Sequence, residues 1–101
     1  MNKKNKIIFI TGSAGFVGFH VSKKLLKNGW SVVGLDAFTD YYDVSIKRKR
    51  NKLLCHSNYF TSIEGRLEDH DLLKNIFDTF KPEIVIHLAA QAGVRYSREN
   101  P

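Results

Sequence analysis

A glycine-rich segment near the start of the chain, residues 11–18 (TGSAGFVG), constrains the fold more than any other stretch. It follows four strand-forming residues, 7–10, and leads into a helical pattern. A strand, a tight turn and a helix in this order direct backbone N–H groups and the positive end of the helix toward an anion. The segment therefore predicts a phosphate-binding turn. The alternative is a flexible connection that binds nothing.

Each glycine of this turn has a separate expected role. Gly12 permits the tight bend, Gly15 lets a pyrophosphate approach the backbone, and Gly18 lets the helix lie close against the strand. The spacing is G-x-x-G-x-x-G, so it matches the usual dinucleotide pattern, G-x-G-x-x-G, only approximately. Other residues must support the turn before a ligand can be named.

Asp36 supplies that support, because it ends a second apolar run, residues 31–35. It lies about 20 residues beyond the turn, the offset expected of an acid that binds a ribose. A carboxylate there accepts hydrogen bonds from ribose hydroxyls and would repel a 2′-phosphate, and Ala37 and Phe38 supply no arginine to counter it. These residues favour NAD over NADP. The alternative is an aspartate exposed in a turn.

The remaining apolar patterns alternate between strands and helices. We expect an α/β fold of order β-α-β-α-β-α-β, a partial Rossmann fold with a doubly wound parallel sheet in strand order 3-2-1-4. The expected strands are 7–10, 31–35, 58–63 and 84–88, and the expected helices are 15–28, one within 39–54, and 69–80.

Finer expectations concern which side chains are buried. Val17, Val21 and Leu25 should form the inward stripe of the first helix. The apolar run 84–88 is typical of a parallel strand covered on both faces, with His87 packed at its end rather than binding a metal. Asp69 should cap the third helix.

Composition limits the possible partners. The chain of 101 residues suits one domain, and its net charge of +6 is concentrated in residues 3–6 and 47–52. Local runs of this kind are usually solvated faces, so we expect no nucleic-acid partner.

Cys55 cannot form an internal disulfide, has no metal-ligand spacing around it, and is expected to be a small core residue. No stretch is apolar for long enough to be a signal peptide or a membrane span, which favours a cytoplasmic protein. We also expect no metal site.

Three motifs together resemble a known family. Residues 11–18, residues 40–43 (DYYD) and residues 87–97 (HLAAQAGVRYS) are similar to extended short-chain dehydrogenase/reductase enzymes. Within that group the chain most resembles NAD-dependent nucleotide-sugar epimerases of the UDP-glucuronate 4-epimerase branch, which serves capsular polysaccharide synthesis. The similarity covers nearly all of the chain, and the third motif is the most specific.

The resemblance implies an enzyme that moves hydride from a sugar C4 to NAD and returns it to the other face. Such enzymes need a tyrosine base with a lysine four residues later, and no tyrosine of this chain has one. Residues 1–101 are therefore expected to be the N-terminal part of an NAD(P)-binding Rossmann domain, without the catalytic pair and without the sugar-binding domain. The alternative is a non-catalytic remnant or nucleotide-binding module. The expected sheet ends at its fourth strand, and the uncovered edge of that strand would favour self-association.

The resemblance also assigns the binding residues. Adenine is flanked by Phe38 and Leu67, and ribose is held by Asp36. The sequence departs from the family at Ala37, where asparagine is usual, and at Arg66, where aspartate is usual, and both changes should weaken adenosine recognition. The other cofactor contacts are Gly12, Ala14, Gly15, Phe16, Val17, Gly18, Leu88, Ala89, Ala90 and Gln91, and a UDP-sugar would border Gly93, Val94 and Arg95.

Overall fold

The computed structural model describes residues 6–38 and 44–88. Four strands alternate with three helices along the chain. In order they are β1 (Ile7–Thr11), α1 (Phe16–Lys27), β2 (Ser31–Asp36), α2 (Val44–Leu54), β3 (Phe60–Glu64), α3 (His70–Phe80) and β4 (Ile84–His87).

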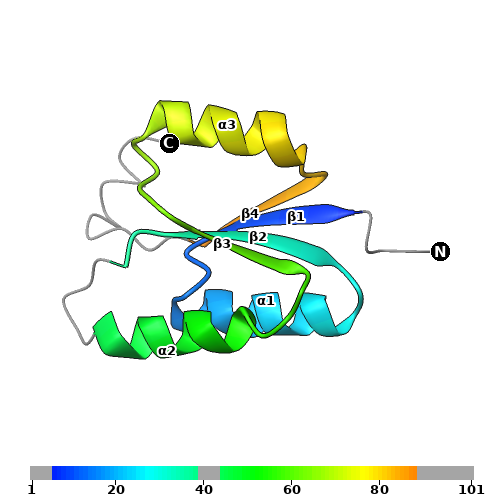
Figure 1. The fold of residues 1–101 in the computed structure, drawn as a ribbon, viewed down its shortest axis with the longest axis vertical. Coiled ribbons are helices and arrows are strands. Elements are labelled where there is room, and N and C mark those ends of the chain that lie inside the picture. The colour runs from blue at the N-terminus through cyan, green and yellow to red at the C-terminus, as the bar shows by residue number, and fades with distance from the viewer. Residues whose placement is uncertain (1–5, 39–43, 89–101) are drawn as a thin grey trace.

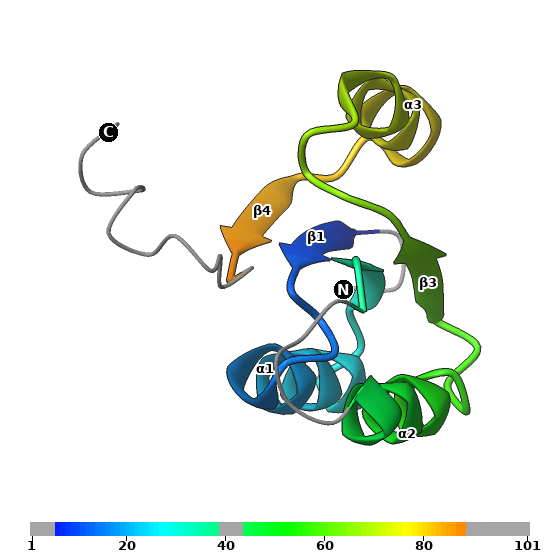
Figure 2. The ribbon, with the colours of Figure 1, turned by 90° about the vertical axis from the view of Figure 1, so that its left-hand side faces the viewer.

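The strands form one parallel sheet in the order β3-β2-β1-β4. Helices α1 and α2 cover one face of the sheet and α3 covers the other, which gives three layers (Figure 1). The carboxyl ends of the strands lie together at one edge (Figure 2). The α/β class, the strand order and the Rossmann-like winding predicted from the sequence are confirmed.

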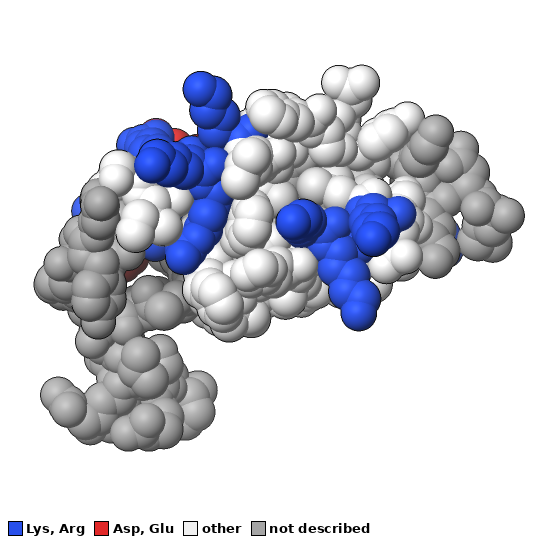
Figure 3. Space-filling model, turned by 90° about the horizontal axis from the view of Figure 1, so that it is seen from below, with Lys and Arg blue, Asp and Glu red and all other residues white. Residues whose placement is uncertain are grey.

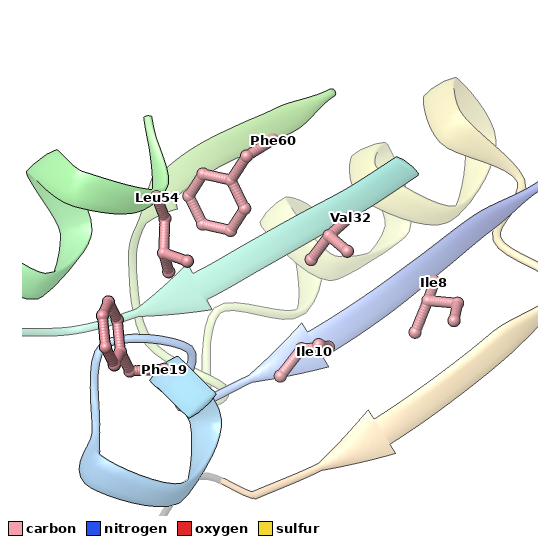
Figure 4. Packing of buried hydrophobic residues seen from close by; sticks show 6 residues of the cluster. All are labelled: Ile8, Ile10, Phe19, Val32, Leu54 and Phe60. Carbon is pink, nitrogen blue, oxygen red and sulfur yellow. The ribbon is translucent and has the colours of Figure 1, made fainter. Parts of the chain in front are cut away.

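Alternation along β1 divides the core into two parts. Ile8 and Ile10 pack toward α1 and α2, together with Val32 of β2 (Figure 4). Phe9 points to the opposite face, where it packs with Ile76 of α3. The central strands are thus buried on both faces, as expected of continuous apolar runs in a parallel sheet.

The predicted inward stripe of α1 is confirmed for Val21 and Leu25, which are partly buried against the core, but is wrong for Val17. Val17 is 56% exposed, whereas Gly18, Phe19 and Ser22 are buried. A Cβ on Gly18 would lie 2.0 Å from the carbonyl oxygen of Gly12, so this glycine must face the turn. Because the side of α1 at Gly18 faces the turn, the adjacent Val17, about 100° further around the helix, lies exposed.

Helix α3 begins and ends as its sequence predicts. The Asp69 carboxylate accepts a hydrogen bond from the N–H of Leu72 at 3.1 Å, which caps the first turn. Lys81 then takes a left-handed conformation, with φ of 49°, and ends the helix. The Phe77 ring meets Phe9 edge-to-face with centroids 5.7 Å apart, although Phe77 is 42% exposed.

The burial predictions for β4 and for Cys55 are wrong. Ile84, Val85 and His87 of β4 are exposed, because β4 is the edge strand of the sheet that the described residues form. Cys55 is exposed rather than part of the core. It directly follows α2, of which Leu54 is the buried residue.

Candidate functional site: the glycine turn and Asp36

The turn between β1 and α1 is fixed by backbone hydrogen bonds. Gly12 has a φ of 76°, which favours glycine, and its N–H donates to the carbonyl of Leu35 at 2.7 Å. The N–H of Gly15 donates to the carbonyl of Gly12 at 3.1 Å. The turn is therefore held to the end of β2 as well as to its own backbone.

Gly15 is different, because the fold leaves room for a side chain there. Its backbone is extended, with φ of −70° and ψ of 171°, and an added Cβ would meet the Gly12 oxygen only at 3.4 Å. It is the N-cap of α1, yet no side chain caps this helix and its first turn holds no acidic residue. Helix geometry leaves the first N–H groups without partners inside the helix, and an anion suits such a terminus.

Asp36 lies directly beside this turn, as the sequence predicts. Its Oδ2 accepts a hydrogen bond from the N–H of Ala14 at 3.0 Å, and its Oδ1 accepts one from the N–H of Phe38 at 2.9 Å. The residue is 5% exposed, so it is not an aspartate free in a turn. Ala14 and Gly15 donate their N–H groups within the fold, whereas the next three amides, those of Phe16, Val17 and Gly18, have no acceptor among the described residues.

Phe38 takes a conformation that is rare for its residue type. Its φ is 55°, in the left-handed region, and such strain in a bulky residue costs about 1–3 kcal/mol. The conformation lets its N–H reach Asp36. Its ring is buried, and the Arg48 guanidinium lies over it, 4.1 Å from the ring centre.

Arg48 is in turn held by Glu64 at the end of β3. The two side chains form a two-pronged ion pair with N–O distances of 3.0 and 3.1 Å. This hydrogen bonding lowers the pKa of Glu64 and raises that of Arg48. The pair thus holds Arg48 over the ring of Phe38, one of the two residues predicted to flank adenine. The other, Leu67, is half-buried and packs against the core on the α3 side of the sheet.

Sequence reasoning missed the cations that α2 directs toward the turn. Lys47 Nζ lies 3.3 Å from Oδ1 of Asp36, and Arg50 donates to the carbonyl of Ala14 at 3.3 Å. The prediction that residues 47–52 form only an exposed face is wrong for these two. Lys47, Arg50 and the buried Leu54 are spaced i, i+3, i+7, and that periodicity was the signal available in the sequence.

On the other side of β1, a small network joins the ends of β1 and β4. Thr11 Oγ1 accepts the N–H of Leu88 at 3.0 Å and lies 2.7 Å from Nδ1 of His87. The network holds Leu88, the residue after β4, beside the end of β1. The strand order reverses between these two strands. Ligands of doubly wound sheets bind at this point.

The structure leaves part of the predicted site undescribed. Leu88 is the last of its residues in the described part of the chain. Ala89, Ala90, Gln91, Gly93, Val94 and Arg95 lie outside the described residues. Within residues 6–38 and 44–88, no group of three or more His, Cys, Asp or Glu side chains could hold a metal ion. No helix of these residues is long and apolar enough to cross a membrane.

Residues 9–101 match the model of a family described as GDP-mannose 4,6 dehydratase. The chain belongs to this family. It is 53% identical over 92 residues to a probable UDP-glucuronate 4-epimerase of Rhizobium meliloti (strain 1021), and 52% identical over 94 residues to protein CapI of Staphylococcus aureus. These matches cover 91% and 93% of the chain, respectively. The resemblance to nucleotide-sugar epimerases is confirmed.

A solved structure agrees with these relatives. The UDP-glucuronic acid 4-epimerase of Bacillus cereus, in complex with UDP-glucuronic acid and NAD, superimposes with a TM-score of 0.74 at 37% identity. The match covers 90% of this chain and 28% of that one. The chain likewise spans 27% of the Rhizobium relative and 28% of the Staphylococcus relative. The matches therefore establish the family of the chain, and they do not establish the activity of a complete relative for these residues.

Proposed function

We propose that this chain is the cofactor-binding N-terminal part of an NAD-dependent nucleotide-sugar 4-epimerase, and that it binds the adenosine diphosphate portion of NAD. The Bacillus epimerase that it resembles was solved with NAD and UDP-glucuronic acid. NAD, when bound, supplies the hydride acceptor for oxidation at the sugar C4. UDP-hexose or UDP-glucuronate is the proposed substrate class of the complete enzyme.

In this proposal, the residues of this chain bind and orient the cofactor. The amides of Phe16 and Val17 and the positive end of α1 receive the pyrophosphate, with Gly15 leaving room for its approach. Asp36 accepts a hydrogen bond from a hydroxyl of the adenosine ribose, and Phe38 and Leu67 flank the adenine. Leu88 to Gln91 continue toward the nicotinamide, and Gly93 to Arg95 border the nucleotide sugar.

One observation carries this proposal: Asp36 is buried against the same turn whose helix terminus has no cap. A carboxylate beside a positive helix end could simply serve as an anionic partner for that end. However, Asp36 contacts Ala14, before the helix, and no side chain caps α1. A ribose-binding acid next to an open diphosphate site accounts for both facts.

We further propose that residues 1–101 do not catalyse epimerisation by themselves. The sequence holds no tyrosine followed four residues later by lysine, the pair that the family uses as general base. Binding without turnover therefore fits these residues. A cytoplasmic location fits an exposed, unpaired Cys55 thiol, since thiols stay reduced there.

Calorimetric titration of the 101-residue protein with NAD tests the proposal. Asp36→Asn keeps the shape of the side chain but removes the charge, and should weaken NAD binding by roughly tenfold or more. Circular dichroism of the variant checks that it stays folded. Equal affinity of the wild-type protein and a folded Asp36→Asn variant, or no NAD binding by the wild-type protein, would refute the proposed site.

A further inference from the structure

Two basic residues of α2, Lys47 and Arg50, contact Asp36 and the glycine turn. Leu54 is its buried residue, while its basic residues differ in what they contact. The Lys47 side chain is 19% exposed and that of Arg48 is 51% exposed. Figure 3 shows that Lys and Arg side chains gather in separate groups on the face formed by α1 and α2, with uncharged surface between them.

Arg50 places a positive charge beside the beginning of α1. Its guanidinium donates to the carbonyl of Ala14 and sits 5.8 Å from the ring centre of Phe16, next to the beginning of α1. That terminus already carries partial positive charge, and its first turn holds no acidic residue. A diphosphate at the helix terminus would interact favourably with both the helix and the guanidinium.

Lys47 lies where the ribose is proposed to bind. A carboxylate offers about four lone-pair sites, and three donors already use those of Asp36: the amides of Ala14 and Phe38 and the Lys47 ammonium. The ammonium has three donor hydrogens. It can therefore hold the carboxylate and donate to a ribose hydroxyl oxygen at the same time.

We infer that α2 supplies two cations to the dinucleotide, with Lys47 binding the adenosine ribose and Arg50 binding the pyrophosphate. This inference rests on the proposed function and adds residues to it. Arg48 has a different role, because its guanidinium is held by Glu64 and covers Phe38. The helix thus contributes two ligand contacts and one wall of the adenine pocket.

Calorimetric titration with ADP, which carries the ribose and the diphosphate but no nicotinamide, tests the two contacts. The variants are Lys47→Met, which keeps the apolar stem, and Arg50→Gln. Lys49→Met is the matched control, because Lys49 is an exposed cation on the same helix. Circular dichroism and thermal unfolding of each variant report whether α2 remains folded.

We expect Lys47→Met and Arg50→Gln each to raise the ADP dissociation constant by roughly tenfold or more, and Lys49→Met to change it by less than about threefold. Arg50→Gln should also reduce the dependence of ADP binding on salt, because an ionic contact is lost. Arg50→Lys should recover part of the affinity.

Two results would overturn the inference, and they can be told apart. If wild-type protein binds ADP and the Lys47 and Arg50 variants behave like Lys49→Met, the proposed cofactor site stands and the role of α2 is wrong. If folded wild-type protein binds neither ADP nor NAD, the proposed function fails and the inference fails with it.

Discussion

Gly15 and Gly18 stand three residues apart in one turn, and the structure gives them different reasons to be glycine. At Gly18 a Cβ would overlap the backbone of Gly12, so the fold itself requires glycine. At Gly15 the backbone angles suit any residue and a Cβ has room. The fold does not require glycine at position 15, whereas the proposed approach of a diphosphate to this backbone would favour it.

This difference predicts opposite effects of one substitution on stability and on binding. Gly15→Asp places a good capping residue at the start of α1 and should raise the free energy of unfolding by about 0.5 kcal/mol. The same carboxylate would repel a diphosphate and should weaken NAD binding at least roughly tenfold. Chemical denaturation and calorimetry measure the two effects.

Gly15→Asn is the matched control, because it caps the helix without a charge. It should weaken NAD binding less than Gly15→Asp does. An aspartate variant that binds NAD as tightly as the wild-type protein would show that no anion binds at this terminus.

The Glu64–Arg48 pair predicts a pH dependence of stability. Its hydrogen bonds lower the pKa of Glu64 in the folded state below its ordinary value of 4.5. The stabilisation is therefore present above pH 4.5 and is lost as the pH falls through the lowered pKa. Glu64→Gln should be less stable than wild type at pH 7 in urea unfolding, and the difference should shrink at about pH 3. A difference that is the same at both pH values would mean that the ion pair does not stabilise the fold.

Most of the helices and strands could be predicted from the sequence. The four strands and three helices follow from apolar runs and periodicity, and Asp69 marked the start of α3 in advance. The role of α2 could be predicted only in part. The spacing of Lys47, Arg50 and the buried Leu54 indicates that these residues share one side of the helix, unlike the exposed Lys49. What that side faces depends on how α2 packs against α1, which local sequence does not encode.

The cap of α3 gives a prediction at this scale. Asp69→Ala removes the acceptor for the N–H of Leu72 and should lower the free energy of unfolding by about 1 kcal/mol. Asn75→Ala, at an exposed position of the same helix, should not destabilise the protein. Urea denaturation measures both variants. Equal stability of the two would mean that the cap contributes nothing.

At the scale of the whole molecule, the sheet formed by the described residues has β4 at one edge. β4 pairs with β1 on one side, and among the described residues no strand pairs with its other side. Exposed Ile84 and Val85 add apolar surface there. The sequence pattern suggested a strand covered on both faces, since periodicity cannot show whether a covering element is present.

We predict that the isolated 101-residue protein self-associates through β4, because unpaired strand edges recruit partners. Val85→Lys should lower the average mass measured by light scattering at high concentration. Tyr59→Lys, at another exposed apolar position, should not. A wild-type protein that stays monomeric at high concentration would contradict this prediction.

Amide NMR of the 101-residue protein during titration with NAD tests the central claim most directly, because it reports on each residue of the site. The account predicts that the largest shift changes fall on Phe16 and Val17 of the turn and on Asp36 and Phe38, with Lys81 at the far end of α3 unaffected. Changes confined to other parts of the sheet, or none at saturating NAD, would contradict the account.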